Sequence, residues 1–159
     1  MVANAVPVAI ALGSNQGNRE RLLTSAVTAL SAHLSDITVS TFHDTAPVGV
    51  VDQPRFLNAA AIGHTTHPPA DLLRVLLGIE RQFGRERPFQ GAPRTLDLDL
   101  ILYGDVVLQG PDVVVPHPRF RERRFVLAPL AEIAAEWIDP VTGLAIGELL
   151  ARLDGSASA

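Results

Sequence analysis

Hydrophobic and polar residues alternate along the first two thirds of the chain in a way that predicts four strands and two helices. Strands are expected over residues 6–12, 37–42, 56–65 and 96–103. One helix follows Asn18, its capping residue, with an apolar face from Leu22 to Leu34. The other opens at Pro68 and Pro69 and reaches residue 83, with Gly84 as its C-cap.

The remaining third is predicted to contain a hairpin and two more helices. A Gly-Asp turn after residue 103 leads to a short strand over 106–108, and the proline-rich stretch 113–124 is extended or irregular. Helices are expected over 125–138 and 146–153, before a frayed tail at 154–159. The core order βαββαβ is that of a ferredoxin-like α+β fold, an antiparallel sheet with helices packed on one face. We expect one domain over residues 1–159.

Composition narrows the class of protein. Hydrophobic residues make up 47% and charged residues 19% of the chain, an ordinary globular balance. No apolar run has the length that a bilayer requires, and the first residues lack the basic region and cleavage pattern of a signal peptide. We therefore expect a cytoplasmic protein without a membrane partner. Because there is no cysteine, any metal must bind to oxygen or histidine ligands.

The net charge of −4 argues against a general nucleic-acid binder, but the basic residues are unevenly placed. All thirteen are arginines, and seven lie between Arg85 and Arg124 together with six acids. Genomic composition bias explains this usage as well as a phosphate site does, although arginine forks bind phosphate oxygens in pairs.

The stretch PRTLDLDLILYG places Asp97 and Asp99 in a strand rich in leucine. Residues two apart point to the same face, with Cα atoms about 7 Å apart. The two carboxylates therefore project together, while Leu96, Leu98 and Leu100 face the core. Paired carboxylates are ligands that Mg²⁺ prefers. The alternative is an edge strand that uses acids for solubility.

Three arginines, Arg85, Arg87 and Arg94, precede this strand in a polar loop. Arginines beside metal-binding carboxylates suit nucleoside triphosphate chemistry, whereas a simple ion pair with an aspartate is an equal alternative for Arg94. The chain has no GxxxxGK[ST] motif and is not a P-loop protein.

Two other polar residues are candidates. His117 lies between two prolines that stiffen its backbone, so it is either structural or a donor to phosphate. Asn58 either caps the preceding loop or offers a paired donor and acceptor to a heterocycle.

Five motifs occur in a fixed order: GSN, T-x-P-x-G-x-x-x-Q-x-x-F-x-N, IE-x-x-x-GR-x-R, G-x-PRTLDLDL and VPHP-x-x-x-x-R-x-F. Together they resemble 6-hydroxymethyl-7,8-dihydropterin pyrophosphokinases of folate synthesis. That resemblance implies direct transfer of pyrophosphate from ATP to the pterin hydroxymethyl oxygen, giving AMP.

The resemblance also implies a role for each matching residue. Asp97 and Asp99 would bind two Mg²⁺ ions, and Arg87 would approach ATP when the site closes. Positions matching ATP-binding residues are Glu80, Arg85, Arg94, Leu100, His117 and Arg123. Positions matching the pterin site are Gly13, Thr45, Pro47, Val48, Phe56, Asn58 and Phe125.

Some positions depart from the family pattern. Phe56 replaces a tyrosine, Ala46 replaces a proline, and the loop tryptophan is missing, with Phe89 as a substitute. Two other functions stay open on the residues alone: a different Mg²⁺-dependent phosphotransferase or nucleotidyltransferase, and a ferredoxin-like module that only binds or regulates. We expect a monomer.

Overall fold

The computed structural model describes residues 5–15, 18–45, 56–83 and 96–157. The elements, in chain order, are β1 (Val6–Ser14), α1 (Arg19–Leu30), β2 (Ser35–Val39), β3 (His43–Thr45), β4 (Phe56–Thr65), α2 (Pro69–Phe83), β5 (Asp97–Tyr103), β6 (Leu108–Gln109), β7 (Val114–Val115), the 3₁₀ turn η1 (Phe120–Glu122), α3 (Arg124–Ala134) and α4 (Ile146–Ala157).

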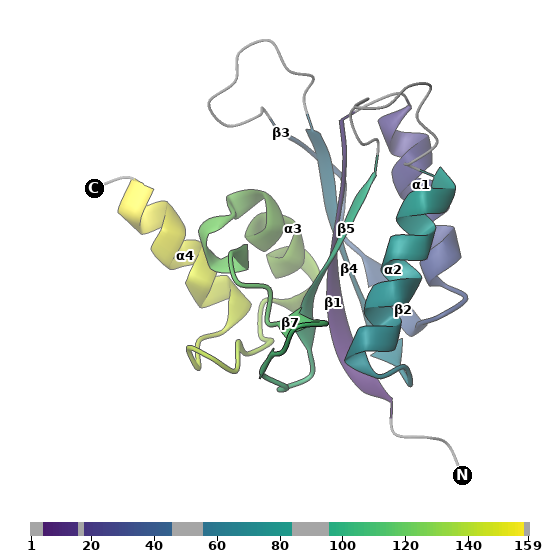
Figure 1. The fold of residues 1–159 in the computed structure, drawn as a ribbon. Coiled ribbons are helices and arrows are strands. Elements are labelled where there is room, and N and C mark those ends of the chain that lie inside the picture. Colours follow the sequence, from purple (N-terminus) through teal and green to yellow (C-terminus); the bar gives the residue numbers. More distant parts are fainter. Residues whose placement is uncertain (1–4, 16–17, 46–55, 84–95, 158–159) are drawn as a thin grey trace.

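The central sheet is antiparallel, with strand order β2-β4-β1-β5, and β3 also pairs with β4. This order confirms the predicted ferredoxin-like α+β core. The helices, however, cover both faces: α1 and α2 lie on one side of the sheet and α3 and α4 on the other (Figure 1). The two helices of the predicted core, α1 and α2, thus share one face as expected, and α3 and α4, to which the sequence assigned no face, lie on the other side.

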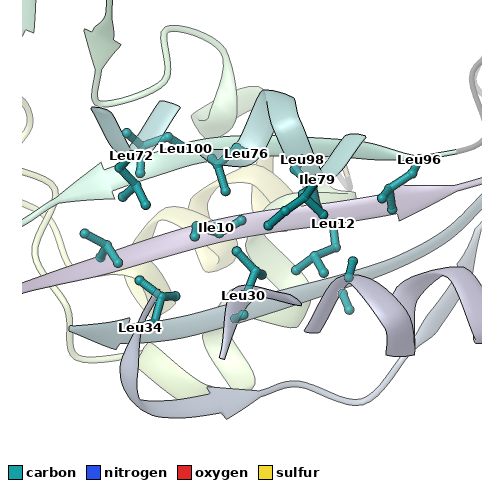
Figure 2. Packing of buried hydrophobic residues seen from close by; sticks show 14 of the residues in the cluster. Ile10, Leu12, Leu30, Leu34, Leu72, Leu76, Ile79, Leu96, Leu98 and Leu100 are labelled. Atoms are coloured by element: carbon teal, nitrogen blue, oxygen red, sulfur yellow. The ribbon is translucent and has the colours of Figure 1, made fainter. Parts of the chain in front are cut away.

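The two faces differ in the size of their side chains. On the α1/α2 face, leucines from α2 interdigitate with Ile10 and Leu98 (Figure 2). On the other face β1 and β4 present the small, buried residues Ala9, Ala11 and Ala60, against which α3 packs. Alanine leaves room for a helix to approach the sheet closely, and each large side chain that the helix buries contributes about 1.5–3 kcal/mol.

Several element boundaries differ from the prediction. The predicted strand 37–42 is divided, because the Ser40 hydroxyl accepts a hydrogen bond from the Ala60 N–H at 2.9 Å in place of a backbone partner. Helix α1 ends at Leu30, and Leu34 is buried in the turn that follows. Towards the other end, α4 continues to Ala157, past residue 153, where the helix was predicted to end.

A hairpin follows β5, but it is made of other strands than predicted. The strand after the turn, β6, pairs with β7 rather than with β5. Gly104 has φ +54°, and its N–H donates to the Pro7 carbonyl at 2.7 Å, which directs the chain away from the sheet. The helix predicted over residues 125–138 is also shorter than expected, since α3 ends at Ala134.

Candidate active site

The register of the sheet brings distant parts of the sequence into one row. Asp97 pairs with Gly13, Gly13 pairs with Asn58, and Asn58 pairs with His43. Directly paired residues point to the same face, here the face that α3 covers. Asp99 lies in the adjacent row, opposite Ala11. The predicted metal ligands Asp97 and Asp99 therefore share one end of one sheet face with Gly13 and Asn58.

The alternation predicted for the aspartate strand is present. Asp97 and Asp99 are partly exposed, whereas Leu98 and Leu100 are buried on the opposite face. The Leu100 side chain packs in the core with α1 and α2 and so does not reach the aspartate face. Any contact of Leu100 with a nucleotide would involve its backbone.

Glu80 of α2 stabilises β5, the strand that carries the two aspartates. Its carboxylate is 4% exposed, and Oε2 accepts a hydrogen bond from the Leu98 N–H at 2.7 Å. Leu98 lies between the two aspartates, and its N–H points to the edge of β5 that does not face β1. This hydrogen bond from Leu98 fixes the position of β5 against α2.

Gly13 and Thr45 determine how Asn58 lies. A Cβ atom on residue 13 would approach Asn58 Oδ1 to 2.9 Å, so only glycine leaves room for the amide in its present position. Asn58 is 5% exposed, and its Nδ2 donates to Thr45 Oγ1 at 2.7 Å. Phe56 is paired with Thr45 and lies on the same face. The Asn58 amide thus joins β4 to β3, and its recognition of a ring stays a prediction.

His117 is attached to the exposed edge of β5. The backbone N–H of His117 donates to the Ile101 carbonyl at 3.0 Å, and its ring Nδ1 accepts from the backbone N–H of Arg119 at 3.1 Å. The neutral ring therefore carries its proton on Nε2. Burial lowers the pKa of His117; the Asp99 carboxylate opposes that shift, and the guanidinium groups of Arg123 and Arg119 reinforce it.

The downstream arginines divide into two groups. The Arg123 guanidinium lies 5.7 Å from the ring centroid of Phe125, at the start of α3. Arg121 instead binds the fully buried Asp139 through two hydrogen bonds of 2.5 and 2.9 Å, and Arg124 pairs with Asp154 at 2.8 Å. Arg121 and Arg124 are thus engaged in structural ion pairs.

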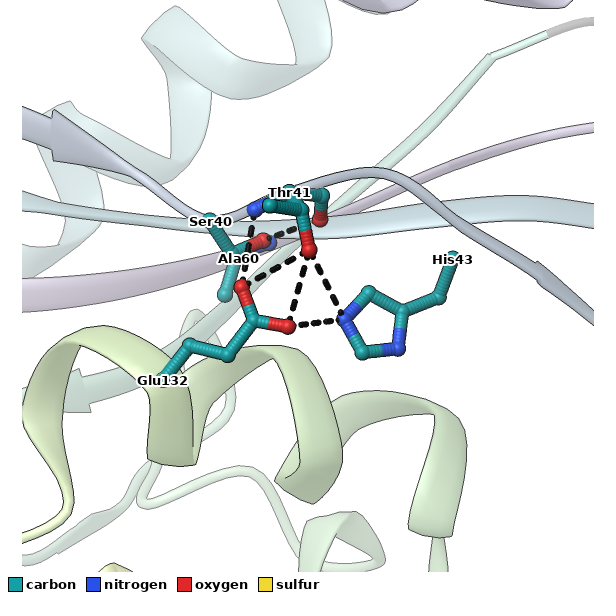
Figure 3. Close-up of polar contacts among 5 residues, drawn as sticks. All are labelled: Ser40, Thr41, His43, Ala60 and Glu132. Atoms are coloured by element: carbon teal, nitrogen blue, oxygen red, sulfur yellow. Dashed lines mark hydrogen bonds and ion pairs between the residues drawn. The ribbon is translucent and has the colours of Figure 1, made fainter.

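Part of the predicted site lies outside the described residues. These positions are Pro47, Val48, Arg85, Arg87 and Arg94, together with Ala46 and Phe89. Conversely, no sequence pattern indicates a cluster formed by Thr41, His43 and Glu132, in which α3 contacts β3 and the segment before it (Figure 3). A separation of 89 residues between His43 and Glu132 leaves no local pattern to find.

These features define a ferredoxin-like α+β protein with paired carboxylates and a buried amide at one end of its sheet. A sequence profile for 7,8-dihydro-6-hydroxymethylpterin-pyrophosphokinase (HPPK) matches residues 9–135. The chain belongs to this family of ATP-dependent pyrophosphokinases in folate synthesis. The five motifs that carried the resemblance all lie within the matched residues.

Individual relatives agree with this assignment. The chain is 45% identical over 129 residues to 2-amino-4-hydroxy-6-hydroxymethyldihydropteridine pyrophosphokinase of Bacillus subtilis, covering 80% of this chain and 77% of the relative. It is 44% identical over 133 residues to the mitochondrial folate synthesis bifunctional protein of Arabidopsis thaliana, covering 83% of this chain but only 24% of that protein.

A solved structure supports the fold. The wild-type HPPK-DHPS of Plasmodium falciparum superimposes with a TM-score of 0.77 at 13% identity, covering 94% of this chain and 45% of that one. In the part of the chain that the structure describes, no helix is long and apolar enough to cross a membrane.

Proposed function

We propose that this chain transfers pyrophosphate from ATP to 6-hydroxymethyl-7,8-dihydropterin at the end of the sheet defined by Asp97, Gly13 and Asn58. The observation that supports this most is the register, because it brings the carboxylates of Asp97 and Asp99 and the amide of Asn58 to the same end of one sheet face. A phosphotransferase with another substrate, or a module that only binds, has no need of that combination.

The two aspartates fit Mg²⁺ in their chemistry. Among the described residues no group of three or more metal-binding side chains occurs, but Mg²⁺ commonly takes one or two carboxylates and completes its shell with water and phosphate oxygens. Asp97 and Asp99 would hold the two ions, with Glu80 fixing their strand from the opposite face. Bound Mg²⁺ would neutralise phosphate charge during transfer.

Pterin recognition is assigned to Asn58 and the residues around it. A side-chain amide offers two N–H donors and one acceptor, of which Thr45 takes one donor. Phe56 and Phe125 would enclose the flat ring as aromatic partners. Gly13, Pro47 and Val48 complete the proposed binding residues.

ATP binding is assigned to cationic residues that precede and follow β5 in the sequence. Arg85, Arg94 and Arg123 would bind phosphate oxygens, and the His117 Nε2–H would donate to one. The hydroxymethyl oxygen would form a bond to the β-phosphorus while the bond from that phosphorus to the α,β-bridging oxygen breaks, releasing AMP and a proton. Arg87 would approach the phosphates as the site closes, so that catalysis rests on positioning and charge.

The test is an assay of AMP release by the purified chain. AMP should appear only when ATP, Mg²⁺ and the hydroxymethyl pterin are all present. Release of AMP without the pterin, or pterin binding without any AMP, would contradict the proposal. A single domain, a monomeric state and a cytoplasmic location remain predictions from sequence.

A further inference from the structure

Thr41, His43 and Glu132 form a polar contact between the sheet and α3, which we call the β3–α3 clamp (Figure 3). Glu132 Oε1 accepts hydrogen bonds from the N–H and the Oγ1 of Thr41, both at 2.9 Å. Glu132 Oε2 pairs with His43 Nε2. The His43 and Glu132 side chains are 27% and 34% exposed, and Thr41 is exposed, so the clamp lies at the surface of the protein.

Strand β3 carries one half of the proposed pterin site. His43 pairs directly with Asn58, and Thr45, two residues further on the same face, binds the Asn58 amide at 2.7 Å. A shift of β3 would therefore move the hydroxyl that orients Asn58. Since β3 has only three residues, its own backbone pairing with β4 fixes it weakly.

Helix α3 carries the other half. Phe125 lies in its first turn, and Glu132 follows seven residues later. Seven residues are about two helical turns, so both side chains lie on the same side of the helix, roughly 10 Å apart along its axis. The clamp therefore joins the element that orients Asn58 to the element that carries the aromatic Phe125.

We propose that His43 and Glu132 are positioning residues for the pterin, which fix β3 and α3 at the separation the ring requires. This inference rests on the proposed function, because it takes the ring to lie between these two elements. Neither residue is assigned a contact with substrate.

Binding measurements on clamp variants test the inference. Glu132→Ala removes the acceptor of both contacts and should weaken binding of 6-hydroxymethyl-7,8-dihydropterin about tenfold, since tenfold corresponds to 1.4 kcal/mol, the scale of one hydrogen bond. Affinity for a non-hydrolysable ATP analogue with Mg²⁺ should change less than about twofold on that scale. Glu132→Gln, whose amide oxygen can still accept from Thr41, should restore part of the loss.

The same strand provides a matched control. Asp44 points to the opposite face and pairs with Arg19 of α1 at 3.3 Å. Asp44→Asn should leave pterin affinity unchanged. An equal loss of pterin affinity in Asp44→Asn and Glu132→Ala would mean that any loosening of β3 suffices, which would overturn the specific role of the clamp.

Two further variants separate the possible failures. His43→Phe keeps the Thr41–Glu132 bonds, so it decides the question even if Glu132→Ala does not fold; unchanged pterin affinity in His43→Phe would overturn the inference. Asn58→Ala reports on the proposed site itself. If Asn58→Ala weakens pterin binding and the clamp variants do not, the clamp fails alone. If Asn58→Ala has no effect, the proposed site fails as well.

Discussion

At the scale of single residues, the site depends on polar groups held by unusually small or buried neighbours. Gly13 leaves space for the Asn58 amide, and Glu80 fixes the backbone between Asp97 and Asp99 from the other side of the sheet. An aspartate pair in an apolar strand is unfavourable for folding alone, because acidic residues are depleted in strands. The proposed Mg²⁺ site would account for its presence.

Replacing either aspartate by asparagine should remove the charge while keeping the shape. We expect Asp97→Asn and Asp99→Asn each to lower turnover at least about 100-fold, the scale of losing a key electrostatic group, with little change in the unfolding temperature. Steady-state assays of AMP release at saturating Mg²⁺ measure this. Near-normal turnover in both variants would remove the metal assignment.

Replacing Asn58 by alanine should affect one substrate only. Loss of the amide leaves polar groups of the ring unpaired, so pterin binding should weaken by roughly 1–3 kcal/mol while ATP binding is retained. Isothermal calorimetry with each ligand separately tests this. Equal losses for both ligands would contradict a role specific to the pterin.

At the scale of elements, a buried ion pair connects η1 to the loop after α3. Asp139 is fully buried and accepts hydrogen bonds from Arg121, from Thr142 Oγ1 at 2.7 Å and from the Val141 N–H at 3.0 Å. Burial raises the pKa of Asp139, but these hydrogen bonds outweigh it and lower the pKa from 3.8 to about 2. The pair fixes the segment that follows α3, and it holds η1, which lies between His117 and Arg123.

The lowered pKa predicts how this contact responds to acid. A depressed carboxyl pKa contributes stability that is fully present above the unfolded value near 3.8 and is lost as pH falls through about 2. Asp139→Asn should therefore reduce the free energy of unfolding by roughly 2–3 kcal/mol at neutral pH, and the difference from wild type should shrink across that acidic range. Urea unfolding at several pH values measures it, and a constant difference would contradict the assignment.

At the scale of the whole molecule, the sheet lies between two helical layers that differ in how they pack. Large aliphatic side chains fill the α1/α2 layer, whereas alanines of β1 and β4 form the surface of the sheet on which α3 packs. The small size of these alanines sets how close α3 comes to the sheet. Phe125 and Arg123, at the start of α3, are positioned with it. The position of the proposed site thus depends on small residues at some distance from it.

Enlarging one of these alanines should separate α3 from the sheet. Ala9 is 0% exposed, and Ala9→Leu should lower the free energy of unfolding by about 1–3 kcal/mol through overpacking. Ala32→Leu, at an exposed position in the turn after α1, is the control and should be nearly neutral. Chemical denaturation of both variants tests this, and equal stability of the two would show that the layer has room to spare.

The sequence by itself determined the strands β1, β4 and β5, most of the helices and the side of β5 on which Asp97 and Asp99 lie. These features follow from local periodicity: a period of two residues assigns each side chain of a strand to one face. The motif order also identified the family, because those residues occur as short contiguous groups. Local patterns could not show that α3 covers the second face and that α4 packs on α3, since an apolar helix does not indicate which surface it will bury.

Only the tertiary structure decided which of these residues meet. Pairing of β1 with both β4 and β5 sets Gly13 between Asp97 and Asn58, although the three are far apart in the chain. In the folded chain Arg121 is paired with Asp139 and His43 with Glu132. The Leu100 side chain lies on the face opposite the aspartates. Contacts of this kind depend on strand register and helix packing, which arise from the whole core at once and leave no trace in a local stretch of sequence.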